Sequence, residues 1–179
     1  MTEVFLQLSY PQLSRLIQSE ANKQEINVKG YDLKIDKLVI NSEDGRLRIT
    51  GQIVSKWDAY FDFQATPMFL NSENKLELQD IKLKLDATNL IFKGIIKLAK
   101  GMIKSRIEKI LESPLTEQIE GLKQNLDQEL SKAPLPHQLQ LNSNTHHLLI
   151  ETIQALEQYL LIALKIEQKI NISFKDQEV

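Results

Sequence analysis

Alternation between apolar and polar residues dominates the first half of the chain. From Leu47 to Ala65, apolar or small residues occupy every odd position except Ser55, and most of the even positions between them are polar. Nineteen residues with a period of two predict an extended strand of roughly 60 Å, at ~3.3 Å per residue. Ordinary strands have about five or six residues. We therefore expect one unusually long amphipathic strand, joined to the preceding strand by a hairpin at Asp44–Gly45.

The N-terminal residues predict a strand, a helix and a second long strand. Val4–Leu8 is typical of a short strand, and Ser9 to Gln12 has the pattern of a capping box with proline in the first helical turn. This helix should end between Asn22 and Gln24. After it, apolar residues change from even to odd positions beside Gly30, which predicts a bulge or bend within one long strand.

Further strands are expected on both sides of a long helical segment. A turn at Asn71–Asn74 should precede a strand from Leu76 to Leu85, whose apolar phase changes near Asp80. Segment 137–155 is harder to assign, although its leucines and isoleucines favour a strand. The last segment, Leu160–Phe174, keeps one apolar face and predicts another long strand. The order of elements predicts an α+β fold with a mainly antiparallel sheet, in a single domain over residues 1–179. That domain is either complete or one half of a longer protein or assembly.

The helical segment opens at Thr88–Asn89 and carries an unusually broad apolar arc. Pro114, with Ser113 as a candidate cap, should divide it into two helices or kink it, and Pro134 and Pro136 should end it. Between residues 90 and 111, apolar side chains cover roughly half the circumference at ~100° per residue. Opposite them runs a basic stripe made of Lys93, Lys97, Lys100 and Lys104.

Three interpretations of this helix remain open. A strongly curved sheet could simply enclose it. Alternatively, the arc exceeds what the sheet covers and leaves an apolar groove for acyl chains, whose burial is worth about 0.8 kcal/mol per methylene. In the third, the lysines rest on an anionic membrane surface. The candidate ligand-binding residues, chosen as apolar groups expected to face inward, are Phe92, Ile95, Ile96, Ala99, Met102 and Ile103 of the helix, with Trp57, Phe61 and Phe63 of the long strand.

Composition narrows the classes of function. Acidic and basic residues number 24 and 22, and aromatic residues make up 6%, so neither a phosphate-neutralising surface nor a base-stacking surface is expected, and nucleic acid is not an expected partner. The absence of cysteine excludes disulfides and thiolate chemistry. No signal peptide or membrane-spanning run is visible. The compartment is left open, and the chain as written is expected to be cytoplasmic.

No pattern nominates a catalyst, a metal site or a cofactor. The three histidines are His137, His146 and His147, and adjacent strand residues point to opposite faces. There is neither a glycine-rich phosphate loop nor a nucleophile elbow. We therefore expect a protein that is not an enzyme.

The chain resembles the tubular lipid-binding (TULIP-like) superfamily, and within it an uncharacterised bacterial domain family. The resemblance is carried by Leu8-Ser9-Tyr10-Pro11-Gln12-Leu13, Gly30, Gly51, Thr66-Pro67, and the stretch from Leu78-Gln79-Asp80-Ile81 to Thr88-Asn89. It implies a long, strongly curved antiparallel sheet wrapped around a long helix. It also implies non-enzymatic binding of a lipid or another hydrophobic small molecule between sheet and helix. Peripheral membrane contact through the basic helix, and a homodimer or a second TULIP-like domain, are the further partners that we consider. The competing hypothesis is a structural or interaction module with a dry core that docks a partner protein or a membrane surface.

Overall fold

Two helices and eight strands make up the described part of the chain. The computed structural model describes residues 2–70, 72, 75–131 and 139–174, and for most of residues 119–131, 139–148 and 167–174 it describes the backbone alone. The elements are β1 (Thr2–Ser9), α1 (Tyr10–Ala21), β2 (Ile26–Val28), β3 (Tyr31–Glu43), β4 (Arg46–Val54), β5 (Asp58–Leu70), β6 (Lys75–Ala87), α2 (Leu90–Ser131), β7 (Leu139–Ala155) and β8 (Tyr159–Phe174).

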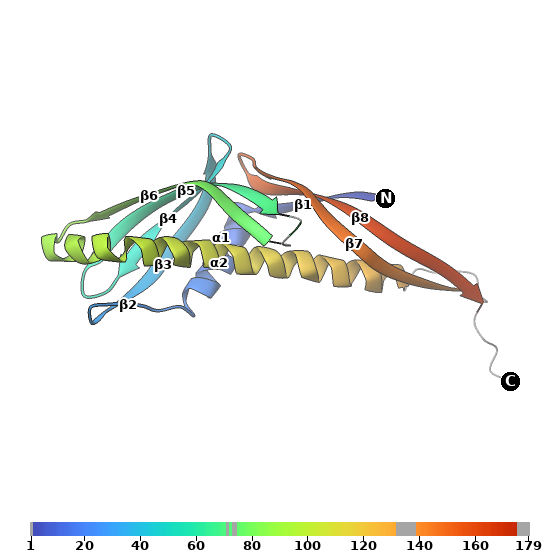
Figure 1. Cartoon of the computed structure of the whole chain (residues 1–179), viewed down its shortest axis with the longest axis horizontal. Coiled ribbons are helices and arrows are strands. Elements are labelled where there is room, and N and C mark those ends of the chain that lie inside the picture. Colours follow the sequence, from blue (N-terminus) through green and yellow to red (C-terminus); the bar gives the residue numbers. More distant parts are fainter. Residues whose placement is uncertain (1, 71, 73–74, 132–138, 175–179) are drawn as a thin grey trace.

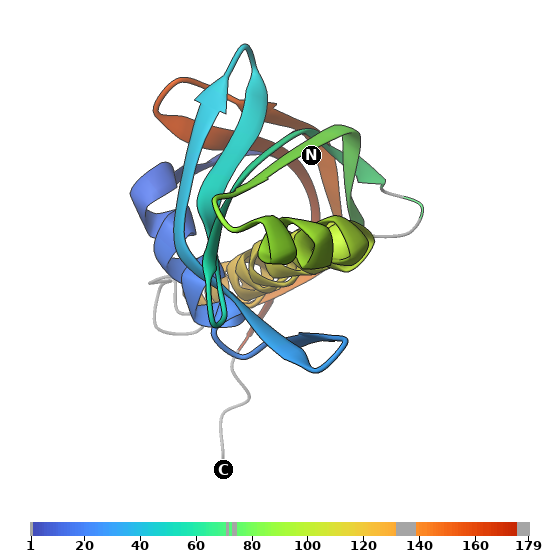
Figure 2. The same cartoon turned by 90° about the vertical axis from the view of Figure 1, so that its left-hand side faces the viewer.

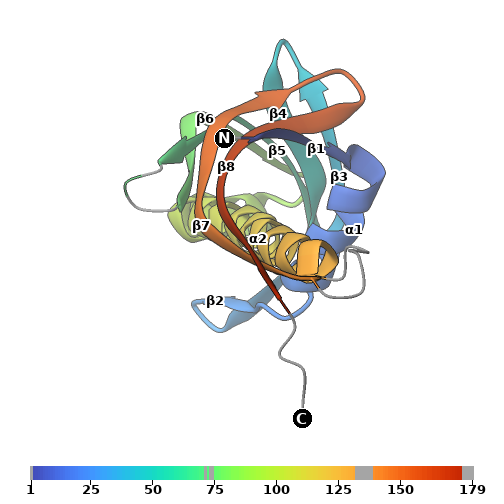
Figure 3. The same cartoon turned by 90° about the vertical axis from the view of Figure 1, so that its right-hand side faces the viewer.

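Two antiparallel sheets curl around the long helix. One has five strands in the order β2-β3-β4-β5-β6, and the other has three in the order β1-β8-β7. Helix α2 runs along the length of the molecule beneath both sheets (Figure 1), and the views from its two ends show the strands arching over it (Figures 2 and 3). The expected α+β fold, with a strongly curved antiparallel sheet and a long helix, is confirmed.

The predicted nineteen-residue strand is two strands. β4 ends at Val54, and β5 returns antiparallel from Asp58, with Ile53 opposite Ala59 and Leu47 opposite Ala65. Directly opposite residues of an antiparallel pair lie on the same face of the sheet. In this register odd positions face odd positions, so the inward residues keep their parity through the turn. Alternation alone therefore could not reveal the turn between β4 and β5.

The region around Gly30 is a hairpin, not the predicted bulge or bend in one long strand. Val28 pairs with Tyr31, and the two residues between them, Lys29 and Gly30, have φ values of 50° and 80°. Positive φ at both central residues is the geometry that connects twisted strands in two residues. The predicted hairpin at Asp44–Gly45 has the same geometry, with φ of 52° and 72°, and is confirmed.

The other strand predictions largely agree with the structure. The phase change near Asp80 is confirmed, because Asp80 has φ 51° and the pairing of β5 with β6 shifts opposite it. A second shift, between Asp36 and Val39, was not predicted. The C-terminal strands β7 and β8 cover the segments expected to be extended. The predicted turn residues Asn71, Glu73 and Asn74, and also Pro134 and Pro136, lie outside the described residues.

Helix α1 ties the two sheets together. The hydroxyl of Tyr10 donates to the carbonyl oxygen of Leu156 at 2.6 Å, and the hydroxyl of Ser42 donates to the same oxygen at 2.8 Å. One carbonyl in the β7–β8 connection thus holds both α1 and β3. Burial raises the pKa of Tyr10, and the nearby hydroxyl of Ser42 opposes this shift. The capping box at the start of α1 differs from the prediction. The hydroxyl of Ser9 donates a hydrogen bond to the side-chain oxygen of Gln12 at 2.8 Å, and the Ser9 side chain makes no hydrogen bond to a helix amide.

Helix α2 begins with an asparagine cap and runs unbroken to Ser131. The side-chain oxygen of Asn89 accepts hydrogen bonds from the backbone amides of Ile91 and Phe92 at 2.9 and 3.0 Å, as expected for a cap. Pro114 lies inside the helix and does not divide it. A proline has no N–H to donate to the residue four positions earlier. The burial of Pro114 and its neighbour Leu115 indicates that packing offsets this loss.

The core lies between the curled sheets and one face of α2. Phe63, Ile49, Ile53, Phe92 and Ile103 are fully buried there. Gly51 makes room for one ring of this core: a Cβ at Gly51 would lie 2.7 Å from Cε1 of Phe61, its cross-strand partner. A side chain at this position would collide with the ring.

Candidate functional site

Side chains on the inner face of the five-stranded sheet are fully buried at the centre of the sheet, and several on β6 are partly exposed. On β5, Ala59, Phe63 and Ala65 are fully buried. On β6, which ends the order of that sheet, the inward side chains Leu76 and Ala87 near its two ends are buried, but the four between them are only partly buried. They are Leu78, Ile81, Leu83 and Leu85. Because β6 has one strand neighbour, its inner face depends on α2 for cover, and that cover is incomplete. We call this boundary the β6–α2 seam.

Two clefts lie along the β6–α2 seam. The first has a volume of about 190 Å³; its apolar lining is Leu85, Ala87 and Ile96, and Lys93, Lys97 and Lys100 line the same cleft. The second has about 300 Å³ and lies further along, between Leu76 and Leu78 of β6 and a polar stretch of α2 that includes Ser105 and Glu108. Pockets for small ligands have about 300–1,000 Å³, so the second cleft stands at the lower end of that range. The seam therefore offers an apolar strip with a basic border at one end and a mixed, mainly acidic one at the other.

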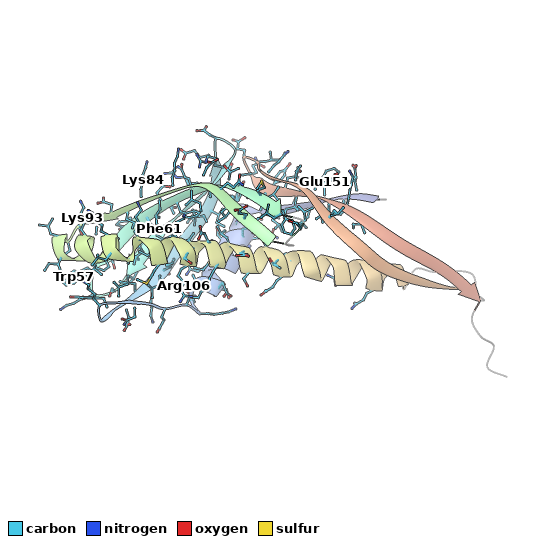
Figure 4. All side chains as sticks on the ribbon, in the orientation of Figure 1. Trp57, Phe61, Lys84, Lys93, Arg106 and Glu151 are labelled. Atoms are coloured by element: carbon cyan, nitrogen blue, oxygen red, sulfur yellow. The ribbon has the colours of Figure 1, made fainter. Side chains whose placement is uncertain are left out.

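An aromatic cluster packs beside the first turns of α2. The ring of Trp57, in the β4–β5 turn, lies 6.1 Å from that of Phe92 and 6.2 Å from that of Tyr31. Lys56 places its ammonium 5.4 Å from the centre of the Trp57 ring. These separations suit aromatic and cation–π contacts. The cluster joins the β2–β3 and β4–β5 hairpins to the helix, and Figure 4 labels Trp57 beside the first turns of α2. Trp57 is half-buried in it.

Most of the predicted ligand-binding residues lie together in the core. Phe92, Ile95, Ile96, Ala99 and Ile103 face the sheet, opposite Phe61 and Phe63. Of these, only Ile96 lines one of the two seam clefts. Residues that the sequence analysis missed, chiefly Leu83 and Leu85, are more accessible. Their alternation on an edge strand was visible in the sequence, but which strand forms the edge was not.

The expectation that Met102 faces inward is wrong. Its side chain is 43% exposed and lies on the outer side of α2. The apolar arc of this helix is wider than the part that the sheets contact. At ~100° per residue, Met102 points about 100° away from the buried Ile103.

The four predicted lysines are exposed and lie on one side of α2. Lys104 comes within 3.9 Å of Glu108, one helical turn away. Among the described residues, the other three have no ion pair. The chain from residue 90 to 107 holds four lysines and Arg106 but no acidic residue. Arg106 turns the other way and donates to Gln24 at 3.1 Å. The lysines thus form a basic border beside the seam.

Neither a metal centre nor a membrane-crossing helix is found in the described part of the chain. No three His, Asp or Glu residues gather there in a way that could hold a metal ion. His137 lies outside the described residues, and the side chains of His146 and His147 are not described. No helix in that part is both long and apolar enough to cross a bilayer.

Comparison with known proteins identifies a family for nearly the whole chain. A family described as "Domain of unknown function (DUF4403)" matches residues 3–173. No curated protein and no solved structure matches the chain. The match runs from β1 through α2 and to within one residue of the end of β8, so it includes both sheets and both walls of the β6–α2 seam. This chain is therefore a member of the DUF4403 family.

Proposed function

We propose that this protein binds a lipid or another hydrophobic ligand along the β6–α2 seam and catalyses no reaction. The observation that carries the proposal is the contrast between the buried inner side chains at the centre of β5 and the partly exposed ones in the middle of β6. An acyl chain laid along Leu83 and Leu85 would remove apolar surface from water on both partners. Such burial contributes about 0.8 kcal/mol per methylene.

Chain length should control affinity. At about 0.8 kcal/mol per methylene, each added carbon should strengthen binding about fourfold until the seam is filled. The basic border favours a ligand with an anionic head group, because Lys93, Lys97 and Lys100 line the same cleft as Leu85 and Ile96. We therefore propose a single-chain or double-chain amphiphile with a negatively charged head as the ligand class.

Mass spectrometry of the purified protein is the first test. A native spectrum followed by organic extraction should reveal a stoichiometric lipid and give its head group and chain length. An apo mass that persists after incubation with mixed lipids would contradict the proposal.

A matched pair of variants locates the site. Leu85→Trp fills the seam with a bulky ring, whereas Lys84→Trp places the same ring on the opposite face of the same strand. The first should abolish lipid uptake and the second should preserve it, with both folded by circular dichroism. Ala99 is unsuitable for such a test, because it is fully buried and a tryptophan there would overpack the core. Equal uptake by both variants would remove the seam from consideration.

A dry interaction module is the second candidate. The buried state of Phe61, Phe92 and Ala99 favours it, since the space between β5 and α2 is filled by side chains. In that case function would lie in the exposed surfaces. A protein that binds no amphiphile of any chain length, yet associates with a protein partner, would support this candidate.

A further inference from the structure

The outer side of α2 carries an apolar face that no described element covers. Leu90 is 85% exposed, Ile91 64%, Leu98 60% and Met102 43%. At ~100° per residue these four side chains fall within an arc of about 120°, and they span about 18 Å of helix at ~1.5 Å per residue. We call them the outer apolar face. Gly94 and Gly101, which are exposed, lie within the same arc.

This face is separate from the seam. The buried residues of α2, such as Phe92, Ala99 and Ile103, occupy the opposite arc against the sheets. The lysines Lys93, Lys97, Lys100 and Lys104 lie between the two arcs, on the side of β6. The N-terminal half of α2 therefore has three sectors: buried, basic and exposed apolar.

Charge is concentrated on this part of the molecule. The chain has 22 basic and 24 acidic residues, of which residues 90–107 hold five basic and no acidic ones. The rest of the chain therefore has a net charge of −7, while this stretch has +5. An anionic partner surface is complementary to this stretch and repelled by much of the remainder.

A bilayer surface with anionic lipids fits the basic sector and the exposed apolar sector at once. Amphipathic helices lie in the plane of the interface with their apolar side chains at the boundary between head groups and acyl chains, and lysines beside that face reach the phosphates with their long stems. A contiguous apolar patch on a helix otherwise remains in contact with water at a cost. Helix α2 would lie on the membrane, and no helix of the described part of the chain is apolar enough to cross it.

We propose that the outer apolar face and its flanking lysines dock this protein on an anionic membrane surface. The proposal stands independently of ligand binding in the seam. Docking would place the basic border of the seam close to the lipid head groups, so the two proposals are compatible, but each has its own test.

Vesicle co-sedimentation tests the docking. The intact chain should sediment with phosphatidylcholine vesicles that contain phosphatidylserine and much less with phosphatidylcholine alone. Binding should weaken as salt is raised, because the Debye length falls from about 10 Å at 0.1 M to about 3 Å at 1 M. A wild-type protein that stays in the supernatant with both kinds of vesicle would overturn the proposal.

Two pairs of variants assign the binding to α2. Each lysine near an anionic surface contributes about fivefold in affinity, so Lys97→Gln with Lys100→Gln should weaken binding roughly 25-fold. Lys23→Gln with Lys34→Gln removes the same charge from surface ion pairs elsewhere and should have little effect. Leu98→Ser with Met102→Ser should also release the protein from vesicles. The control for that pair, Val39→Ser with Tyr60→Ser, changes exposed apolar residues of the sheet and should not.

The alternatives give different results. If the lysine or the apolar variants of α2 bind vesicles as tightly as their controls, the docking surface is elsewhere and the proposal fails. If the wild type forms a concentration-dependent dimer that Leu98→Ser with Met102→Ser abolishes, and no vesicle binding is seen, the face belongs to a second copy of the chain. The apolar pair separates this test from ligand binding in the seam, because Leu98 and Met102 do not line the seam clefts, whereas Lys97 and Lys100 line the first of them.

Discussion

A methyl group at Gly51 should destabilise the protein although it adds apolar surface to a strand. An ideal Cβ there lies 2.7 and 2.8 Å from Cε1 and Cζ of Phe61 and 3.0 Å from the carbonyl oxygen of Asp36. The Phe61 ring is 3% exposed and has little room to move, and the carbonyl belongs to the adjacent strand β3. The methyl group thus meets both a buried ring and a backbone atom.

Two opposing effects determine the magnitude. Replacing glycine with alanine inside a strand is worth about 0.5–1 kcal/mol where space allows. Overpacking a filled core costs about 1–3 kcal/mol. The overpacking wins here, so we expect Gly51→Ala to lower the free energy of unfolding by about 1–2 kcal/mol. For a chain of this size that corresponds to a decrease in Tm of about 3–6 °C.

Thermal and urea unfolding of four proteins test this reasoning. The set is the wild type, Gly51→Ala, Phe61→Leu and the double variant. Leucine lacks the two ring carbons that the new methyl group meets, so alanine should cost much less in the Phe61→Leu background. The coupling should be about 1 kcal/mol, within the range for contacting residues.

A helix glycine without neighbours provides the control. Gly101 has nothing within 4 Å of its ideal Cβ position, so Gly101→Ala should raise the stability by about 0.5–1 kcal/mol. If Gly51→Ala also stabilises the protein, or costs the same with either side chain at position 61, the close approach to Phe61 is not what requires glycine.

Two further changes probe the local contacts that hold the elements in place. Asn89→Ala removes the side-chain acceptor of two amides at the start of α2 and should cost about 1 kcal/mol in chemical unfolding, whereas Asn89→Asp should restore most of it; a neutral alanine variant would contradict the role of the cap. Tyr10→Phe removes a bond to the Leu156 carbonyl and should cost about 1 kcal/mol at neutral pH. Because the pKa of Tyr10 is raised in the folded protein, its stabilising contribution is complete below the ordinary value of 10.0 and is lost as the pH rises above it. Unfolding measured from pH 8 to pH 11 should therefore show a steeper loss of stability in the wild type than in Tyr10→Phe, and parallel curves would exclude this linkage.

The sequence was sufficient to predict the local structure wherever one or two residues determine the backbone conformation. Asp44–Gly45 specifies a two-residue hairpin, and Asn89 specifies the start of a helix. Asp80 also marks its bulge, through the change of apolar phase around it. The extended segments and the α+β class followed from periodicity, since inward and outward positions alternate whatever the partner strand is.

Periodicity did not reveal where chains of alternating residues turn back. The β4–β5 connection preserves the parity of the inward positions, so the alternation continues through the turn from Ile53 to Ala59. At Gly30 the parity does change, but both a bulge and a hairpin produce such a change. Pairing partners, which depend on the folded sheet, decide between them.

The two surfaces that we propose for ligand binding and membrane docking were decided by the tertiary structure. Ile96, Leu98, Met102 and Ile103 are all large apolar residues, and nothing local distinguishes those that face the sheet from those that face outward. The sequence determined that α2 has a broad apolar arc and a stripe of lysines. Only the packing of the sheets decided that part of this arc is core and part is exposed, because the sheets contact little more than one face of a helix. The position of β6 at the end of its sheet similarly decided that Leu83 and Leu85 are half-covered, since an edge strand has a neighbour on one side alone.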